Sequence, residues 1–454
     1  MKYDKFWVGA VFFIIGLWLF VFIATLRHVI LSENMLMDRD IDLTIPTLGL
    51  ISFNFIYLFL GMFIFIVYLL KIGKLKRDHI RIKSQKPYSN DLCSIIIPAR
   101  EEESVIKRAV LMCLDQTYKN IEVLVIAHNS SDRTYEEAQV KDRRVRAFDL
   151  KTKAAGKSIA LNYGIDQSNG KYILVLDADT VLENDFIESA LSAFDEGPYA
   201  AIQGRVLPIN RKYNFLTRMM AMEDDLWSEP ILTTRTITGK RCPLLGTGFI
   251  IRKDILIEVG MFTNSLVDDH ELTCRLLMKK HRILYLPYCK AYAEEPPSLE
   301  VMLRQRARWG RGFINCLNKR MAEPTDIVGN LLWLMPIGSF FGSIMLLLIA
   351  YASIHNLMFE YLPFTFSYLP LKLWFLVAGI VFALDCLVLL RIHGVRTGLK
   401  YAAYLLPFIP FSQYGGVILY KALFVKTWGT TKTVHGFMAR TSEIPTIKHR
   451  NELL

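Results

Sequence analysis

The middle of the chain carries the run Leu174-Val175-Leu176-Asp177-Ala178-Asp179, an apolar segment that ends in two carboxylates one residue apart. The pattern predicts a buried strand over residues 173–176 with the acids at its carboxyl end, where open α/β sheets bind their ligands. Alternate residues of an extended segment point the same way, so Asp177 and Asp179 can converge on one divalent cation. Because hard cations prefer oxygen ligands and can hold a diphosphate, the run predicts a site for Mg²⁺ or Mn²⁺.

Strands and helices alternate on the N-terminal side of this run. Residues 92–98 and 122–127 are apolar and typical of buried strands, and each is followed by a polar loop. Helices are expected over residues 105–114 and 159–166, the second just after Lys157. Alternation at this spacing predicts an α/β fold in which helices cover a parallel sheet. Ligands then belong at the carboxyl ends of the strands, where the loops gather.

Polar groups suited to ligand chemistry recur on the C-terminal side. Each has an ordinary structural explanation as well: a plain turn, a helix cap, or a basic helix beside a membrane. Lys157 also has two explanations: it is either a solvated surface residue or a point charge facing a diphosphate. The three segments are Gly246-Thr247-Gly248, Val267-Asp268-Asp269 and Gln305-Arg306-Ala307-Arg308-Trp309.

The composition indicates membrane segments at both ends of the chain. The 454 residues are 52% hydrophobic and 21% charged, too apolar for an ordinary soluble protein and too charged for membrane helices alone. Residues 6–26 and 48–70 are each long enough to cross a bilayer, and a basic cluster follows the second. The positive-inside rule then places the N-terminus and everything after Leu70 in the cytoplasm. A cleaved signal peptide is the other explanation of the first run.

Apolar runs return near the C-terminus. Residues 331–351 and 372–390 are expected to form two spans, followed by a basic loop. Residues 401–424 contain two prolines and a Gly-Gly pair, so we expect a bent, re-entrant or interfacial segment that keeps the basic tail inside. Asp385 lies in an apolar run and is expected either to line a channel or to pair with a neighbouring helix.

These patterns divide the chain into four parts. They also predict a multi-pass protein of the plasma membrane. Much of the net charge of +11 borders the apolar runs, where it sets topology and meets membrane lipids, so no nucleic-acid partner is expected. The seven cysteines lack C-x-x-C spacing, so those of the cytoplasmic domain are expected to be reduced core residues without a zinc site. The four parts are a pair of spans with a basic cytoplasmic linker (1–86), a cytoplasmic domain with interfacial helices (87–324), the C-terminal spans with the bent segment (325–425) and a cytoplasmic tail (426–454).

The motifs from about Ser94 to Gly312, in this order and spacing, resemble those of membrane-integrated family 2 glycosyltransferases of the processive polysaccharide-synthase type. Cellulose, chitin, hyaluronan and poly-N-acetylglucosamine synthases belong to this type. The resemblance implies an α/β GT-A (Rossmann-like) domain inserted between N- and C-terminal transmembrane helices. It also implies a nucleotide-sugar donor, most often a UDP-sugar, a divalent cation, and a growing glycan or lipid as acceptor.

The resemblance assigns roles to particular residues. Asp177 and Asp179 match the D-x-D motif, which holds the metal and, through Asp177, the donor diphosphate. Asp269 matches the last acid of the T-E-D motif, the general base. Arg308 belongs to a Q-x-x-R-W motif near the diphosphate and the acceptor. The other matches on the acceptor side are Gln305, Trp309 and Asp268. The other donor-side matches are Glu102, Lys157, Trp428 and Lys432, the last two in a segment that resembles the cytoplasmic gating loop of hyaluronan synthases.

The chain departs from the family pattern in two places. Ala127-His128 stands where the family often has an aspartate pair that holds uracil, so His128 or Asn129 is expected to meet the base. Val267 and Asp268 replace the threonine and glutamate of T-E-D, while the catalytic acid is retained.

The expected activity is inverting transfer of a hexosyl or N-acetylhexosaminyl group, which extends a β-linked polysaccharide and exports it through the membrane helices. The alternative is a non-processive transferase that glycosylates diacylglycerol or a polyprenyl phosphate; Glu294-Glu295-Pro296-Pro297 also occurs in transferases of that broader kind. A receptor or transporter with a degenerate sugar-binding domain is a third possibility, against which the retained acids and Arg308 argue.

Overall fold

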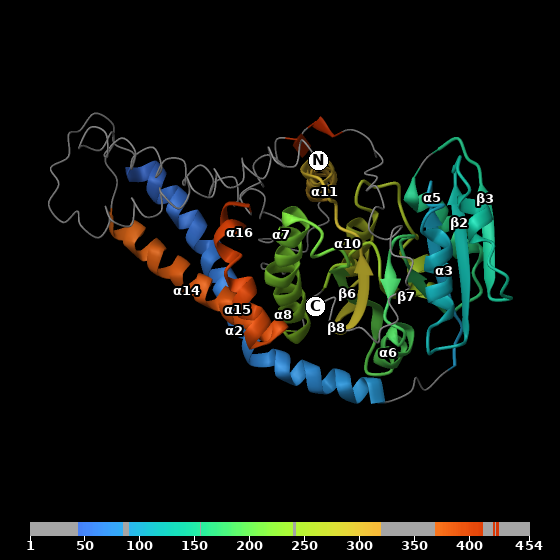
Figure 1. Cartoon of the computed structure of the whole chain (residues 1–454), viewed down its shortest axis with the longest axis horizontal. Helices are drawn as coiled ribbons and strands as arrows, with labels where there is room; N and C mark the ends of the chain where they lie inside the picture. The colour runs from blue at the N-terminus through green and yellow to red at the C-terminus, as the bar shows by residue number, and fades with distance from the viewer. Residues whose placement is uncertain are drawn as a thin grey trace. The chain divides into compact units, whose positions relative to one another are not determined.

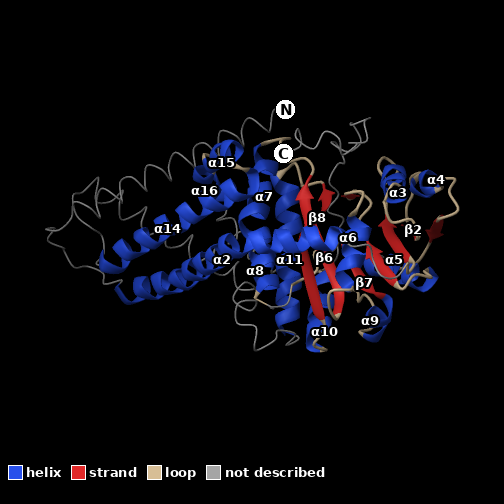
Figure 2. Ribbon diagram, turned by 90° about the horizontal axis from the view of Figure 1, so that it is seen from below, coloured by secondary structure: helices blue, strands red, loops and turns tan. Residues whose placement is uncertain are grey.

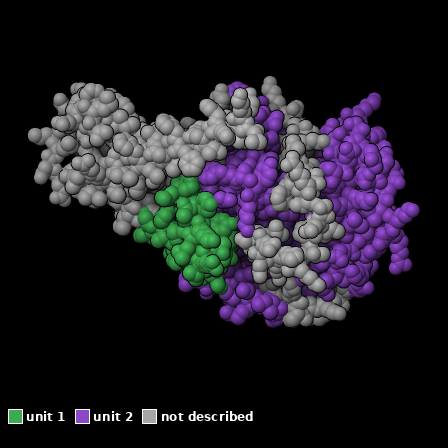
Figure 3. Space-filling model, in the orientation of Figure 1, with its two compact units in different colours: residues 1–69, 328–423 green, residues 70–327, 424–454 purple. Residues whose placement is uncertain are grey.

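The computed structural model divides the chain into two compact units: unit 1, residues 1–69 with 328–423, and unit 2, residues 70–327 with 424–454 (Figure 3). The predicted segments 6–26, 331–351 and 426–454 lie outside the described residues, and so do Trp428 and Lys432. The structure describes residues 44–84, 90–154, 156–238, 242–318, 368–411, 421–422 and 424–425.

Unit 2 is built on one mixed sheet. The strands are β1 (Cys93–Ala99), β2 (Ile121–His128), β3 (Val145–Leu150), β4 (Tyr172–Val175), β5 (Val181–Leu182), β6 (Tyr199–Pro208), β7 (Phe249–Arg252) and β8 (Arg282–Ala293). Among the described residues these eight strands lie in the order β3-β2-β1-β4-β7-β6-β8-β5 (Figure 1).

Helices connect the strands and cover both faces of the sheet (Figure 2). In unit 2 they are α3 (Ile106–Leu114), α4 (Thr134–Ala138), α5 (Lys157–Gln167), α6 (Phe186–Phe194), α7 (Phe215–Glu223), the π-helix η1 (Asp224–Ser228), α8 (Glu229–Ile237), α9 (Lys253–Glu258), α10 (Asp268–Met278) and α11 (Leu299–Asn318).

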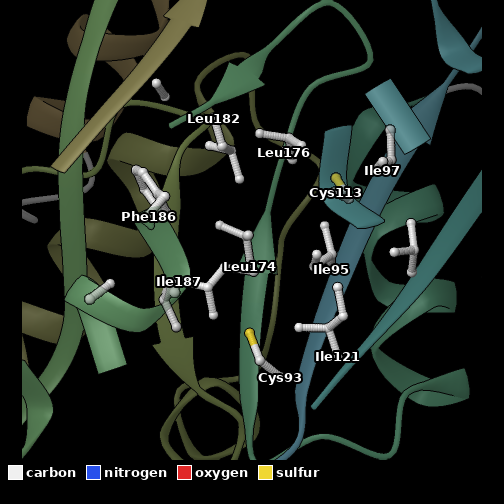
Figure 4. Close-up of a cluster of buried hydrophobic side chains, with 14 of the residues drawn as sticks. Cys93, Ile95, Ile97, Cys113, Ile121, Leu174, Leu176, Leu182, Phe186 and Ile187 are labelled. Carbon is white, nitrogen blue, oxygen red and sulfur yellow. The ribbon is translucent and has the colours of Figure 1, made fainter. Parts of the chain in front are cut away.

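The alternation of apolar side chains along the strands explains the two covered faces. Ile95 and Ile97 of β1 lie in one cluster with side chains of α3 and α6, part of which Figure 4 shows. Ile96, between them, lies in a second cluster with side chains of α5, α9 and α10. Successive residues of a strand point to opposite faces, and a strand that is buried on both faces must be apolar throughout. The runs at residues 92–98, 122–127 and 173–176 meet this requirement.

The prediction of a parallel sheet is confirmed for β3, β2, β1 and β4, and it is wrong for β7, which runs antiparallel to both β4 and β6. The reason lies in the loop before β7. The Gly248 amide donates to the Val175 carbonyl at 3.0 Å, so β7 begins beside the end of β4. A strand that starts at the carboxyl edge of its neighbour can only run in the opposite direction.

The cysteines of unit 2 are buried core residues, which confirms that prediction. All seven cysteines of the chain are free thiols, and only Cys386 is partly exposed. The buried six are Cys93, Cys113, Cys242, Cys274, Cys289 and Cys316.

The described helices of unit 1 are most of α2 (Thr44–Ser84), which continues into unit 2, and α14 (Tyr368–His393), α15 (Val395–Ala402) and α16 (Leu405–Phe411). The predicted spans 48–70 and 372–390 fall within α2 and α14. Among the described residues, no helix combines the length and the apolar character that a membrane crossing requires. In the predicted bent segment 401–424, α15 and α16 are separate helices, and most of the remainder lies outside the described residues.

Candidate active site

The carboxyl ends of β1, β2 and β4 lie at one edge of the sheet, and polar loops follow each of them. The Leu176 amide still donates to the Ile96 carbonyl at 3.1 Å, so the chain remains paired until just before Asp177. The loops after β1 and β2 are bonded to each other: the Glu102 amide donates to Thr134 Oγ1 at 2.7 Å, and Glu101 Oε1 accepts from the Ser131 amide at 2.8 Å. The expected gathering of loops at this edge is confirmed.

A tight turn carries the two acids of the Asp-x-Asp motif. The Thr180 amide donates to the Asp177 carbonyl at 3.0 Å and closes the turn. The Asp177 side chain is 37% exposed, while Asp179 is half-buried. The Asp177 amide donates to Thr247 Oγ1 at 2.9 Å. Thr247, 70 positions later in the chain and just before β7, therefore holds the first residue of the turn.

Lys157 is the cation that faces this turn. Its Nζ lies 2.5 Å from Asp177 Oδ1 and donates to the Gly246 carbonyl at 3.0 Å. Burial lowers the pKa of Lys157, but Asp177, Asp268 and Asp269 outweigh this effect and raise the pKa to about 12. Lys157 is therefore protonated at neutral pH and serves as a counter-ion inside the site, not as a solvated surface residue.

Asp269 lies in the first turn of α10, so the two adjacent acids begin this helix rather than precede it. Its Oδ1 accepts from the His270 amide at 2.8 Å. Its Oδ2 lies beside Gly246, where a Cβ would come within 3.0 Å of it. Burial and the charge of Asp268 raise the pKa of Asp269 to about 6, although Lys157 and Arg308 oppose this shift.

Arg308 reaches the same place from α11. Its Nη1 donates to the Leu266 carbonyl at 2.6 Å, just before the two acids of α10. Burial lowers the pKa of Arg308, and the charges of Asp269, Asp268 and Asp177 oppose that shift. A guanidinium is strongly basic, so Arg308 keeps its charge at neutral pH.

Residues from four distant segments thus meet in one site. Lys157 and Arg308 each interact electrostatically with all three of the acids Asp177, Asp268 and Asp269. Three carboxylates against two cations leave net negative charge when all are ionised. Such a site attracts a further cation, and its positive groups are placed to meet a diphosphate.

The close packing of α11 against the segment before α10 brings Arg308 to the two acids. A Cβ at Gly312 would lie 2.8 Å from Val267 Cγ1 and closer still to Cγ2. Only glycine permits this approach, because the branched side chain of valine cannot turn away.

We expect Gly312→Ala to lower the free energy of unfolding by about 1–3 kcal/mol, the usual cost of overpacking. It should also lower turnover, because Arg308 moves away from the acids. Thermal unfolding and donor turnover are the measurements. The double variant Gly312→Ala/Val267→Ala removes the clash and should recover both; a double variant as impaired as Gly312→Ala would show that the contact is not the cause.

Two of the residues predicted on the acceptor side, Gln305 and Trp309, flank Arg308 on α11. The Arg306 guanidinium stacks on the Trp309 ring, with its Cζ 4.5 Å from the ring centroid, and its Nη2 lies 3.0 Å from Glu223 Oε2. Gln305 Oε1 is buried and has no hydrogen-bond partner among the described residues. The salt bridge between Glu223 and Arg306 was not predicted from the sequence, because a contact across 83 positions leaves no local pattern.

His128 and Asn129, which are expected to meet the base, form hydrogen bonds with Thr152. His128 Nε2 lies 2.7 Å from Thr152 Oγ1, and Asn129 exchanges two hydrogen bonds with the backbone of Thr152, each 2.9 Å long. Burial lowers the pKa of His128, so its ring is neutral at pH 7. These bonds hold both side chains at the end of β2, and their contact with the base stays a prediction.

The cation site predicted at Asp177 and Asp179 is a pair of carboxylates rather than a closed cage. Among the described residues, no three acidic, imidazole or thiol groups gather as a metal-binding set. Mg²⁺ commonly uses one or two carboxylates and takes its other ligands from phosphates and water. Asp177 is accessible and already accepts a cationic group, the Lys157 ammonium. The pair therefore fits a cation that shares its ligands with a diphosphate.

Comparison with known proteins gives one family. Residues 90–312 match the family described as "Glycosyltransferase like family 2". Together with the mixed sheet, this match makes residues 90–312 an α/β glycosyltransferase domain of GT-A-like fold. More particularly, it is a family 2 glycosyltransferase domain.

Several named proteins are similar to this segment. The probable glycosyltransferase YdaM of Bacillus subtilis is 31% identical over 239 residues, which cover 51% of this chain and 57% of that protein. Beta-monoglucosyldiacylglycerol synthase of Trichormus variabilis is 31% identical over 234 residues, 48% of each chain. Poly-beta-1,6-N-acetyl-D-glucosamine synthase of Staphylococcus aureus is 26% identical over 222 residues, 48% of this chain and 54% of that one. The chain thus spans about half the length of these relatives.

A solved structure is also similar. The mannosyltransferase PcManGT of Pyrobaculum calidifontis, in complex with GDP-Man and Mn²⁺, is 16% identical and has a TM-score of 0.47. The match covers 78% of this chain and 98% of that one.

Proposed function

We propose that the chain is an inverting glycosyltransferase that moves a hexosyl or N-acetylhexosaminyl group from a nucleotide-diphosphate sugar to an acceptor hydroxyl. The observation that carries this proposal is the meeting of Asp177, Asp269 and Arg308 around Lys157, from segments far apart in the sequence. A degenerate sugar-binding domain would have no need to keep the base, the cation ligands and the phosphate-binding residues together.

In the proposed reaction the acceptor oxygen attacks the anomeric carbon while the bond from that carbon to the diphosphate breaks. The acceptor proton passes to the Asp269 carboxylate, a general base. Arg308 and Lys157 neutralise charge that develops on the departing nucleoside diphosphate. A divalent cation held by Asp177 and Asp179 would add Lewis-acid stabilisation of the same leaving group.

The raised pKa of Asp269 gives the proposed reaction a pH dependence. A base must be deprotonated to accept a proton, and a pKa of about 6 leaves Asp269 mostly protonated below that pH. We expect kcat/KM for the donor to rise about tenfold per pH unit below the pKa and to level off above it. Turnover measured from pH 4.5 to 8 at saturating Mn²⁺ tests this, and a flat profile across pH 6 with folded protein would contradict it.

Two acceptors are proposed, and each has its own support. Poly-N-acetylglucosamine synthases among the relatives favour a growing β-linked glycan. Glucosyldiacylglycerol synthases, which are more similar in sequence, favour a membrane lipid, as does the Glu294-Glu295-Pro296-Pro297 segment.

Detergent-purified protein incubated with a panel of nucleotide sugars and Mn²⁺ tests the function. Long products on a gel indicate a polymer, and label extracted into organic solvent indicates a glycolipid. Absence of donor turnover with every sugar would refute the proposed function.

We further propose, from the apolar runs of the sequence, that the protein is a multi-pass protein of the plasma membrane with its glycosyltransferase domain in the cytoplasm. The basic residues after the second run support this orientation. Resistance to alkaline extraction and protease protection in oriented vesicles are the measurements. Release at high pH would contradict the proposal.

A further inference from the structure

The loop of residues 244–248 links the two acids of the Asp-x-Asp turn to the helix that carries Asp269. On one side, Thr247 Oγ1 accepts from the Asp177 amide at 2.9 Å and donates to Thr180 Oγ1 at 3.2 Å. The hydroxyl therefore contacts the turn at its first residue and at the residue after Asp179. Because these two bonds use the hydroxyl as both acceptor and donor, they define the orientation of the side chain.

Both threonines of this contact are buried, so water cannot readily take the place of the Thr247 hydroxyl. Thr247 is 5% exposed and Thr180 is 1% exposed. Without the hydroxyl, the Asp177 amide would lose its partner at the point where the chain leaves β4. A buried amide without an acceptor is costly, and the turn would shift to find another.

The loop itself is held firmly against the sheet. Gln203 of β6 is fully buried and bonds three loop residues: its Nε2 donates to the carbonyls of Thr247 and Gly248 at 3.1 and 3.2 Å, and its Oε1 accepts from the Leu245 amide at 2.8 Å. The position of the Thr247 hydroxyl is therefore set by the sheet, not by the loop alone.

The other side of the loop reaches the proposed base. The Leu244 amide donates to Thr273 Oγ1 at 2.9 Å, and that hydroxyl donates to the Asp269 carbonyl at 2.8 Å. Lys157 also donates to the Gly246 carbonyl. The same short segment thus supports the Asp-x-Asp turn, the lysine and the first turn of α10.

We propose that Thr247 is a positioning residue for the divalent-cation site: its hydroxyl holds the turn of residues 177–180 so that the carboxylates of Asp177 and Asp179 meet one cation together with the donor diphosphate. This inference rests on the proposed function and deepens it. Thr247 acts through the turn and touches neither the cation nor the sugar, as outer residues of metal sites commonly do.

The test compares Thr247→Val, which removes the hydroxyl at nearly equal volume, with Thr247→Ser, which keeps it. Thr233→Val is the matched control, because Thr233 is also a buried threonine with a side-chain hydrogen bond, to Glu229. Mn²⁺ binding is measured directly by electron paramagnetic resonance on the full chain, with turnover and Tm alongside. If Thr247→Val fails to fold, Thr247→Ala takes its place, because it also lacks the hydroxyl.

We expect Thr247→Val to raise the Kd for Mn²⁺ about tenfold or more, the usual effect of losing an outer contact of a metal site. Thr247→Ser and Thr233→Val should keep a Kd for Mn²⁺ within about threefold of the wild-type value. Across the variants, the loss of Mn²⁺ affinity should not parallel any fall in Tm. Unchanged Mn²⁺ binding in Thr247→Val, or an equal loss in Thr247→Ser, would overturn the inference alone. A wild-type chain that binds no Mn²⁺ and turns over no donor would overturn the proposed function as well.

Discussion

Asp269→Asn is expected to lower kcat by about 10³-fold while donor binding persists, because a positioned general base contributes on this order. Asparagine keeps the shape of the side chain but cannot accept the acceptor's proton. The substitution leaves Asp177, Lys157 and Arg308 unchanged, so the donor should still bind. The measurements are kcat and the Kd of the nucleoside diphosphate, with Mn²⁺ present, for the donor that the wild-type protein uses.

Asp166→Asn is a suitable control, because Asp166 is an exposed aspartate at the end of α5. It should leave both quantities near wild type. Loss of donor binding in Asp269→Asn would contradict the assignment as base and place the residue on the donor side. A residual rate that no longer rises through pH 6 would add support, because the titrating group is then absent.

Asp179→Ala is expected to remove cation-dependent activity. A bound cation contributes several kcal/mol of charge stabilisation, which at 1.36 kcal/mol per tenfold is a loss of about 10²- to 10³-fold in rate. The half-buried Asp179 lies in the turn that Thr180 closes, so its removal leaves Asp177 with Lys157 as its counter-ion. Turnover is measured as a function of Mn²⁺ and Mg²⁺ concentration, with direct Mn²⁺ binding alongside.

Asp166→Ala serves as the matched control for this second variant. Wild-type dependence on Mn²⁺ in Asp179→Ala would place the cation elsewhere in the site. A variant that binds Mn²⁺ normally but has lost turnover would instead assign Asp179 to the sugar rather than to the metal.

Much of the parallel half of the sheet was predictable, because its signals are local. An apolar run such as residues 173–176 can satisfy both faces of a covered sheet, and polar loops follow such runs at the edge where ligands bind. The placement of Asp177, Lys157, Asp269 and Arg308 in one site was predicted through the family resemblance, from motifs that are each short and ambiguous alone.

Local sequence patterns are enough to define the α/β class, the strands around Asp177 and the residue types available for chemistry, because strand periodicity and turn composition act between neighbours in the chain. The residues that support that chemistry become visible in the folded chain. The antiparallel course of β7 brings Thr247 to Asp177, and the glycine at position 312 brings α11 to Val267. Such contacts join residues tens of positions apart, and they depend on strand order and on shape, which no local pattern encodes.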